Sequence, residues 1–122
     1  MHEIKLRAWD NEKGRYAIKQ DFTDYNIYEP WIMIGSGKLI IESDAVVIFE
    51  QFTGLKDKNG TEIYCGDILI DDTGEPIEYW VVKFSDGGFV GECAGVAESL
   101  FELTNLEVAG NIHENPELVE EK

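Results

Sequence analysis

The sequence predicts an all-β protein: a small SH3-like or related barrel with an additional sheet or hairpin, and at most short helices. Three observations support this class. Short apolar, β-branched runs recur along the 122 residues, clusters of Gly, Asn and Asp separate them, and no long amphipathic helical pattern occurs. Because no linker, internal repeat or low-complexity segment divides the chain, we expect a single domain spanning residues 1–122.

Residues 51–70, QFTGLKDKNGTEIYCGDILI, are predicted to form a strand, a turn, a second strand, a corner and a third strand. Asn59-Gly60 is a strong hairpin signal because both residues tolerate positive φ. Gly66-Asp67 interrupts an apolar pattern, which is typical of a bulge or a barrel corner. The Asp67 carboxylate is expected to accept backbone hydrogen bonds there.

The same stretch resembles part of a calcium-binding loop through Asp57, Asn59 and Glu62. A complete loop needs a glutamate several residues further on, and this glutamate is missing at the required spacing. The hairpin turn is therefore the favoured interpretation.

The first half of the chain is expected to contain short strands. Ile4, Leu6 and Ala8 alternate with charged residues, residues 11–14 form a turn, and residues 15–18 return as a strand. Further short strands are expected at 31–34, 39–41 and 46–49, and the last of these should continue into Gln51-Phe52 as one long strand.

In the second half, residues 78–84, EYWVVKF, have the strongest strand propensity. Residues 85–88 should turn this strand back into Phe89-Val90 as a second hairpin. The helical spacing of residues between 94 and 101 predicts a short helix, and a last strand is expected at 108–112. Trp80 and Phe84 are expected to fill the core.

Three segments resemble the YopX family of phage and prophage proteins. They are the central stretch from QFTGLKDKNG through EIY to GDI, the opening EIKLRAWD at residues 3–10, and GNIHENPEL at residues 110–118. The segments stand in the family's order and span nearly the whole chain. Cys65 and His113 depart from the family's usual charged residue and tyrosine. The resemblance implies a β-rich fold and a phage or prophage origin, and it implies no activity.

The formal net charge of −15 is concentrated in the second half of the chain. Residues 1–60 carry eight Lys and Arg against ten Asp and Glu, whereas residues 61–122 carry two against fifteen. Such a surface repels phosphate backbones, so direct nucleic-acid binding is not expected. A basic patch on a partner protein is the complementary surface.

The sequence predicts a cytoplasmic protein in a bacterial host. It contains two cysteines, its first ten residues lack the apolar core of a signal peptide, and no apolar run approaches the roughly 20 residues of a membrane span. No contact with a membrane is expected.

No motif for catalysis or metal binding stands out. The thiols and imidazoles at His2, Cys65, Cys93 and His113 lack the paired spacing of a zinc site. There is no G-x-S-x-G elbow, and Cys65 has no evident base beside it in the sequence. We therefore predict no catalytic residue, no metal and no cofactor, and an enzyme is the less favoured class.

The binding candidates are Trp9, Trp31 and Tyr64, which could anchor a partner if exposed, together with Asp67. The leading hypothesis is a phage or prophage accessory protein that binds a host or phage protein. Exposed edge strands also make a homo-oligomer plausible. Two alternatives stay open: an acidic mimic of nucleic acid that blocks a host DNA-binding protein, and a metal-dependent hydrolase with carboxylates converging on His2 or His113.

Overall fold

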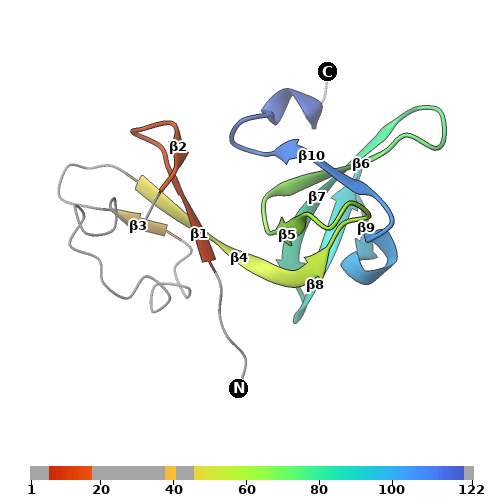
Figure 1. Ribbon diagram of the computed structural model, residues 1–122, viewed down its shortest axis with the longest axis horizontal. Helices are drawn as coiled ribbons and strands as arrows, with labels where there is room; N and C mark the ends of the chain where they lie inside the picture. Colours follow the sequence, from red (N-terminus) through yellow and green to blue (C-terminus); the bar gives the residue numbers. More distant parts are fainter. Residues whose placement is uncertain (1–5, 18–37, 41–45, 120–122) are drawn as a thin grey trace. The chain divides into compact units, whose positions relative to one another are not determined.

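The computed structural model describes residues 6–17, 38–40 and 46–119, and these residues form an all-β structure (Figure 1). They contain ten strands and two short 3₁₀ helices, with no α-helix among them. The chain divides into two compact units, Met1–Gln51 and Phe52–Lys122, and the boundary falls within the long strand β4.

The first unit contains an antiparallel sheet in the order β2-β1-β4-β3. Its strands are β1 (Leu6–Asp10), β2 (Arg15–Tyr16), β3 (Lys38–Ile40) and β4 (Val46–Lys56). Ala8, Val47 and Phe49 form its buried cluster. At the β1–β2 turn, Asp10 Oδ1 accepts hydrogen bonds from the backbone N–H groups of Glu12 and Lys13, both at 2.9 Å.

The second unit contains a five-stranded antiparallel sheet in the order β10-β6-β7-β8-β9, which curls into a half-barrel (Figure 1). Its elements are β5 (Glu62–Tyr64), β6 (Asp67–Asp71), β7 (Glu78–Ser85), β8 (Gly88–Cys93), β9 (Val96–Ser99), η2 (Leu100–Leu103), β10 (Glu107–Asn111) and η3 (Pro116–Leu118). Strand β5 pairs with the last part of β4.

The core of the second unit lies on one face of its sheet. Its buried side chains are Ile63, Leu69, Trp80, Val82, Leu100, Leu103 and Leu106. Side chains alternate between the two faces of a strand, so Trp80 and Val82 point to the core while Tyr79, Val81 and Lys83 point to the opposite face. Short helix η2 packs over β8 at Gly91, where any Cβ would collide with the Leu103 side chain.

The predicted all-β class, with a barrel-like sheet and an additional sheet, is confirmed. The central stretch also folds as expected: β4 and β5 pair as a hairpin with Lys56 opposite Glu62, Gly60 has a φ of 83°, and Gly66 turns the chain with a φ of 93°. The continuous strand through residues 46–52 and the β7–β8 hairpin are confirmed as well.

Two predictions about the second unit are wrong. The short helix expected within 94–101 is replaced over its first part by strand β9, because a tight turn at Ala94-Gly95 brings the chain back along β8; only Leu100–Leu103 form a 3₁₀ helix. Trp80 is buried as expected, but Phe84 is 59% exposed. It lies beside the β7–β8 turn, beyond the last core residue of β7, and packs edge-on against Phe89.

Candidate functional site

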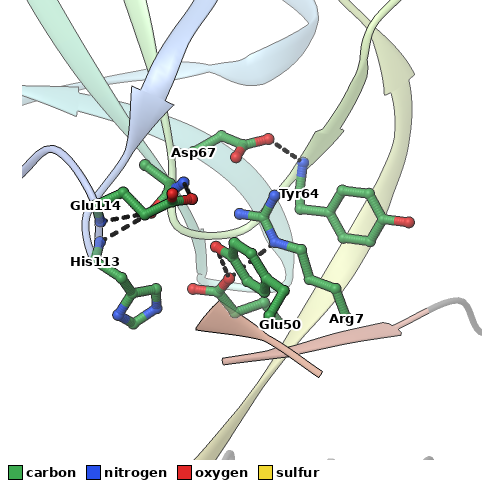
Figure 2. A network of polar contacts seen from close by, with 8 residues as sticks. Arg7, Glu50, Tyr64, Asp67, His113 and Glu114 are labelled. Carbon is green, nitrogen blue, oxygen red and sulfur yellow. Dashed lines mark hydrogen bonds and ion pairs between the residues drawn. The ribbon is translucent and has the colours of Figure 1, made fainter. Parts of the chain in front are cut away.

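The predicted corner at Gly66-Asp67 is a point in the second unit where several backbone hydrogen bonds meet. Asp67 is 2% exposed, and its Oδ2 accepts a hydrogen bond from the Tyr64 N–H at 2.8 Å (Figure 2). The Gly66 N–H donates to the Val82 carbonyl and the Gly66 carbonyl accepts from the Ile112 N–H, both at 2.9 Å. The expectation that the Asp67 carboxylate accepts a backbone hydrogen bond at the corner is confirmed, and this bond stabilises the fold.

The closing segment after β10 forms a compact turn. Asn111 Oδ1 accepts hydrogen bonds from the N–H groups of His113 at 3.0 Å and Glu114 at 2.9 Å (Figure 2). Asn111 Nδ2 donates to Glu114 Oε1 at 2.9 Å. Gly110 leaves no room for a side chain, because a Cβ there would collide with Asn115. These polar groups therefore shape the turn.

The Asp57 carboxylate, considered as part of a calcium loop, binds backbone N–H groups. Its Oδ1 accepts from Asn59 and Thr61 and its Oδ2 accepts from Val108 of β10, all at 2.9 Å. Burial opposes the charged form, but these three bonds and the nearby Lys58 ammonium outweigh it and lower the pKa of Asp57 below its ordinary value. The carboxylate thus ties the β4–β5 turn to β10, which supports the hairpin interpretation.

In the first unit, the opening segment contributes to a partly buried polar cluster. Arg7 Nε donates to Glu50 Oε1 at 2.9 Å, and the Tyr16 hydroxyl donates to the same oxygen at 3.0 Å (Figure 2). The Arg7 guanidinium also lies over the Tyr16 ring, 4.5 Å from its centroid. Trp9 contacts the Tyr16 ring edge-on, and its Nε1 donates to Asn11 Oδ1 at 2.9 Å.

The four predicted binding residues have different environments. Trp9 is 7% exposed, so its ring is not presented to solvent in this structure. Tyr64 is half-buried and its ring lies 5.4 Å from that of Phe52. Tyr64 and Asp67 are brought together at the corner, whereas Trp31 lies outside the described residues. The described members of this set are thus packed into the protein to different degrees.

A groove in the second unit is the better candidate for a binding site. It is an open groove with about 500 Å³ of space. It is lined by residues 76–79, by the β7 side chains of Val81 and Lys83, by the end of β8 with the β8–β9 turn, and by the segment around η3. Tyr79 and Val81 supply apolar surface, and Leu118 and Val119 line it from the C-terminal segment. A volume of this size is within the range of ligand pockets.

Three charged side chains line the groove, namely Glu78, Lys83 and Glu92. Lys83 Nζ lies 3.0 Å from Glu92 Oε1, forming an ion pair across β7 and β8. Burial raises the pKa of the Cys93 thiol, the charge of Glu78 raises it further, and a backbone hydrogen bond with Tyr79 only partly opposes this. The thiol therefore carries little reactive thiolate at neutral pH.

This groove was not predicted from the sequence. The available signal was in EYWVVKF, where apolar residues occupy both alternating faces of one strand. An antiparallel strand with one face in solvent normally alternates apolar and polar residues. A strand with apolar residues on both faces therefore indicates that each face packs against other parts of a protein.

Within residues 6–17, 38–40 and 46–119, no three His, Cys, Asp or Glu side chains cluster in a way that could hold a metal ion. His2, one of the two imidazoles considered for a hydrolase, lies outside them. No helix in the described part of the chain has the length and apolar character needed to cross a membrane.

Comparisons with known proteins agree with the resemblance seen in the sequence. The crystal structure of protein EF1440 from Enterococcus faecalis is similar, with a TM-score of 0.62 and 24% identity, covering 98% of this chain and 100% of that one. This likeness supports the fold. A search of curated proteins found no match. The family model described as YopX protein matches residues 5–120, nearly the whole chain, and the chain therefore belongs to the YopX family.

Proposed function

We propose that this YopX-family chain is a phage or prophage accessory protein that acts as a binding module, and that the groove beside β7 receives part of a partner protein in the host cytoplasm. The observation that carries the proposal is the groove itself. It combines about 500 Å³ of space with mixed walls: apolar side chains such as Tyr79 and Val81 can hold an apolar side chain of a partner, and the Glu78 carboxylate and the Lys83–Glu92 ion pair add charged groups beside them.

The charge of the second unit favours a basic partner. Residues 52–119 contain three lysines, no arginine and fourteen Asp and Glu. An acidic surface raises the encounter rate with a basic partner and disfavours acidic ones, while apolar contacts in the groove supply affinity. The partner is expected to be a basic host or phage protein.

The chemistry of the groove favours binding over catalysis. A thiol such as Cys93, with its pKa raised, is a poor nucleophile, and the Lys83 ammonium is engaged by Glu92. These groups can orient a bound segment through hydrogen bonds.

A second candidate function, imitation of nucleic acid, is favoured by the charge pattern near the end of the chain. Residues 84–121 contain nine Asp and Glu and no Lys or Arg. A surface of this kind would occupy the phosphate-binding site of a basic host protein. Duplex DNA would then compete with the chain for that protein.

Capture from a bacterial host lysate with two matched variants tests the groove. Ile77 lines the groove and is 50% exposed, so Ile77→Asp should leave the fold intact. Ile112→Asp makes the same change at a 38% exposed side chain outside the groove lining. We expect Ile77→Asp to lose the captured protein and Ile112→Asp to retain it, as measured by mass spectrometry.

The outcomes separate the two candidates. Equal capture by both variants would remove the groove from the proposal. If duplex DNA also displaces the captured protein at constant ionic strength, the nucleic-acid mimic becomes the better description. If neither variant nor the unaltered chain captures a protein above background, the binding function is not supported.

A further inference from the structure

We infer that strand β9 is a docking edge, which accepts an extended basic segment of a partner protein as an added β-strand. This inference rests on the proposed binding function and names the chemistry of the partner. It concerns a different surface from the groove, namely the outer side of Val96–Ser99 and the start of η2.

The edge is open along the whole of β9. The strand is last in the order β10-β6-β7-β8-β9, and among the described residues it pairs with β8 alone (Figure 1). All four of its residues are exposed. An edge of this kind presents unpaired N–H and C=O groups that another strand can bond.

The turn before β9 determines which backbone groups face outward. Ala94 and Gly95 both have positive φ, 50° and 83°, and Cys93 pairs with Val96 across this two-residue turn. In such a hairpin the closing pair is hydrogen-bonded and the bonding alternates along the strand. Val96 and Glu98 therefore bond toward β8. The N–H and C=O groups of Ala97 and the N–H of Ser99 point to the open side, while the Ser99 C=O, as the N-cap of η2, accepts the first bond of that helix.

Exposed apolar side chains flank this edge. Val96 is 53% exposed at its start, and Phe101 is 73% exposed just beyond its end. Leu100 and Leu103 of η2 are buried in the core, which holds the intervening Phe101 in place next to β9. An added strand would meet a preformed edge with an apolar contact at either end, and little ordering of the edge would be needed.

The charge of the edge selects the occupant. Glu98 lies in the middle of β9, Glu102 follows in η2, and no Lys or Arg occurs between Lys83 and Lys122. A second copy pairing along β9 would bring its Glu98 close to the first one, and like charges facing each other across strands are destabilising. A lysine-bearing or arginine-bearing strand would instead place opposite charges together.

The test uses a short synthetic peptide in which lysine alternates with valine, and measures its affinity and the hydrogen exchange of the β9 amides. Ala97→Pro removes one outward N–H without removing a bond to β8, and Ala97→Val keeps that N–H. We expect Ala97→Pro to weaken binding about tenfold and Ala97→Val to leave it unchanged. Peptide binding should slow exchange at Ala97 and Ser99.

A second arm keeps the protein unaltered, so that a folding defect of the proline variant cannot decide the result. Two peptides are compared, one N-methylated on its odd-numbered amides and the other on its even-numbered amides. Each keeps its charge but can no longer donate hydrogen bonds from one of its two edges. Only the peptide whose methylated edge faces β9 should lose binding. If both methylated peptides and both Ala97 variants bind alike, the attraction is only electrostatic and the inference fails.

Two other results would overturn the inference while sparing the proposed function. One is dimerisation of the chain that Ala97→Pro abolishes, with no peptide binding at β9; this would make a second copy the occupant. The other is a partner captured from the lysate that is lost with Ile77→Asp and retained by Ala97→Pro, which would leave the groove as the binding surface.

Discussion

Short polar side chains hold the bends of the second unit by accepting backbone N–H groups. Asp57, Asp67 and Asn111 do this at the hairpin turn, the corner and the end of β10, and each is at most 9% exposed. Backbone groups at bends lack the regular partners of a strand, and leaving them buried and unpaired is costly. These residues belong to the segments that resemble the YopX family, which gives those segments a structural role.

Asp57 allows a test of this role through pH. Replacing it by Asn keeps one accepting oxygen but places an amide N–H₂ opposite the Val108 N–H, so Asp57→Asn should lower the free energy of unfolding by about 1–3 kcal/mol at pH 7. A lowered pKa stabilises the folded state above the ordinary value of 3.8, and this stabilisation is lost as the pH falls through the lowered value.

The measurement is urea unfolding at neutral pH and at successively lower pH below 3.8. The difference between Asp57→Asn and the unaltered chain should shrink as the pH falls. Asp72→Asn, at an exposed position of the β6–β7 turn, is the control and should match the unaltered chain at neutral pH. An unchanged free energy for Asp57→Asn at pH 7 would contradict the assigned role.

Among the elements, two tight hairpins shape the half-barrel sheet. Asp86 and Gly87 join β7 to β8, and Ala94 and Gly95 join β8 to β9; all four have positive φ. This conformation gives a turn whose twist matches that of the paired strands. Aspartate tolerates positive φ better than alanine. The β8–β9 turn therefore holds its first residue, Ala94, in a conformation that alanine disfavours.

This strain predicts that Ala94→Gly stabilises the protein. Left-handed backbone costs alanine about 1–2 kcal/mol, and the extra freedom of glycine in the unfolded chain returns about 0.4–1 kcal/mol of this. We expect the free energy of unfolding to rise by about 0.5–1 kcal/mol, measured by thermal or urea denaturation. Ala97→Gly, in the neighbouring strand, should lower it by a similar amount. A destabilising Ala94→Gly would show that the turn is not strained.

The same turns show how far sequence could predict the fold. The hairpins at Asn59-Gly60 and at residues 85–88 are predictable from turn-forming residues, and Gly60, Asp86 and Gly87 adopt positive φ in the structure. The turn at Ala94 carried no such signal on its first residue, so β9 was mistaken for part of a helix. Trp80 and Phe84 lie on the same face of one strand, so the period-2 pattern predicts both to be in the core. The pattern does not show where along the strand the core ends, and Phe84 lies beyond that point.

The candidate site was harder to predict than the fold, for a related reason. A groove depends on which outward side chains of β7 meet the segment around η3, residues some forty positions apart in the sequence. Large aromatics such as Trp9 were chosen as anchors for their type, but exposure depends on tertiary packing. Charge, by contrast, is a property of composition and was available from the start.

For the whole molecule, the family model matches residues 5–120 and so extends over both compact units. This match establishes the YopX family, and the strands of the described residues establish the all-β class. A single domain over 1–122, a cytoplasmic location and a binding role remain predictions. The charge bears on the last of these, because a net charge of −15 on 122 residues affects solubility, partner choice and stability together.

The charge predicts that salt stabilises this protein. Like charges repel more strongly in the compact state than in the unfolded chain, and the screening length falls from about 30 Å at 0.01 M salt to about 3 Å at 1 M. Salt also weakens the surface ion pairs Lys83–Glu92 and Lys58–Glu107, but exposed pairs contribute at most about 1 kcal/mol each. With many more carboxylates than cations, relief of repulsion should dominate.

The urea midpoint is therefore expected to rise as NaCl increases from about 0.01 M to about 0.5 M, a range over which exposed charges become screened. Glu102 is exposed, so Glu102→Lys reduces the negative charge by two without disturbing the core, and it should raise the midpoint at low salt and flatten its salt dependence. Lys83→Gln should have the opposite effect on the slope. A urea midpoint that falls with salt would contradict this prediction. It would show that ion pairs between the few lysines and nearby carboxylates stabilise the protein more than the repulsion between carboxylates destabilises it.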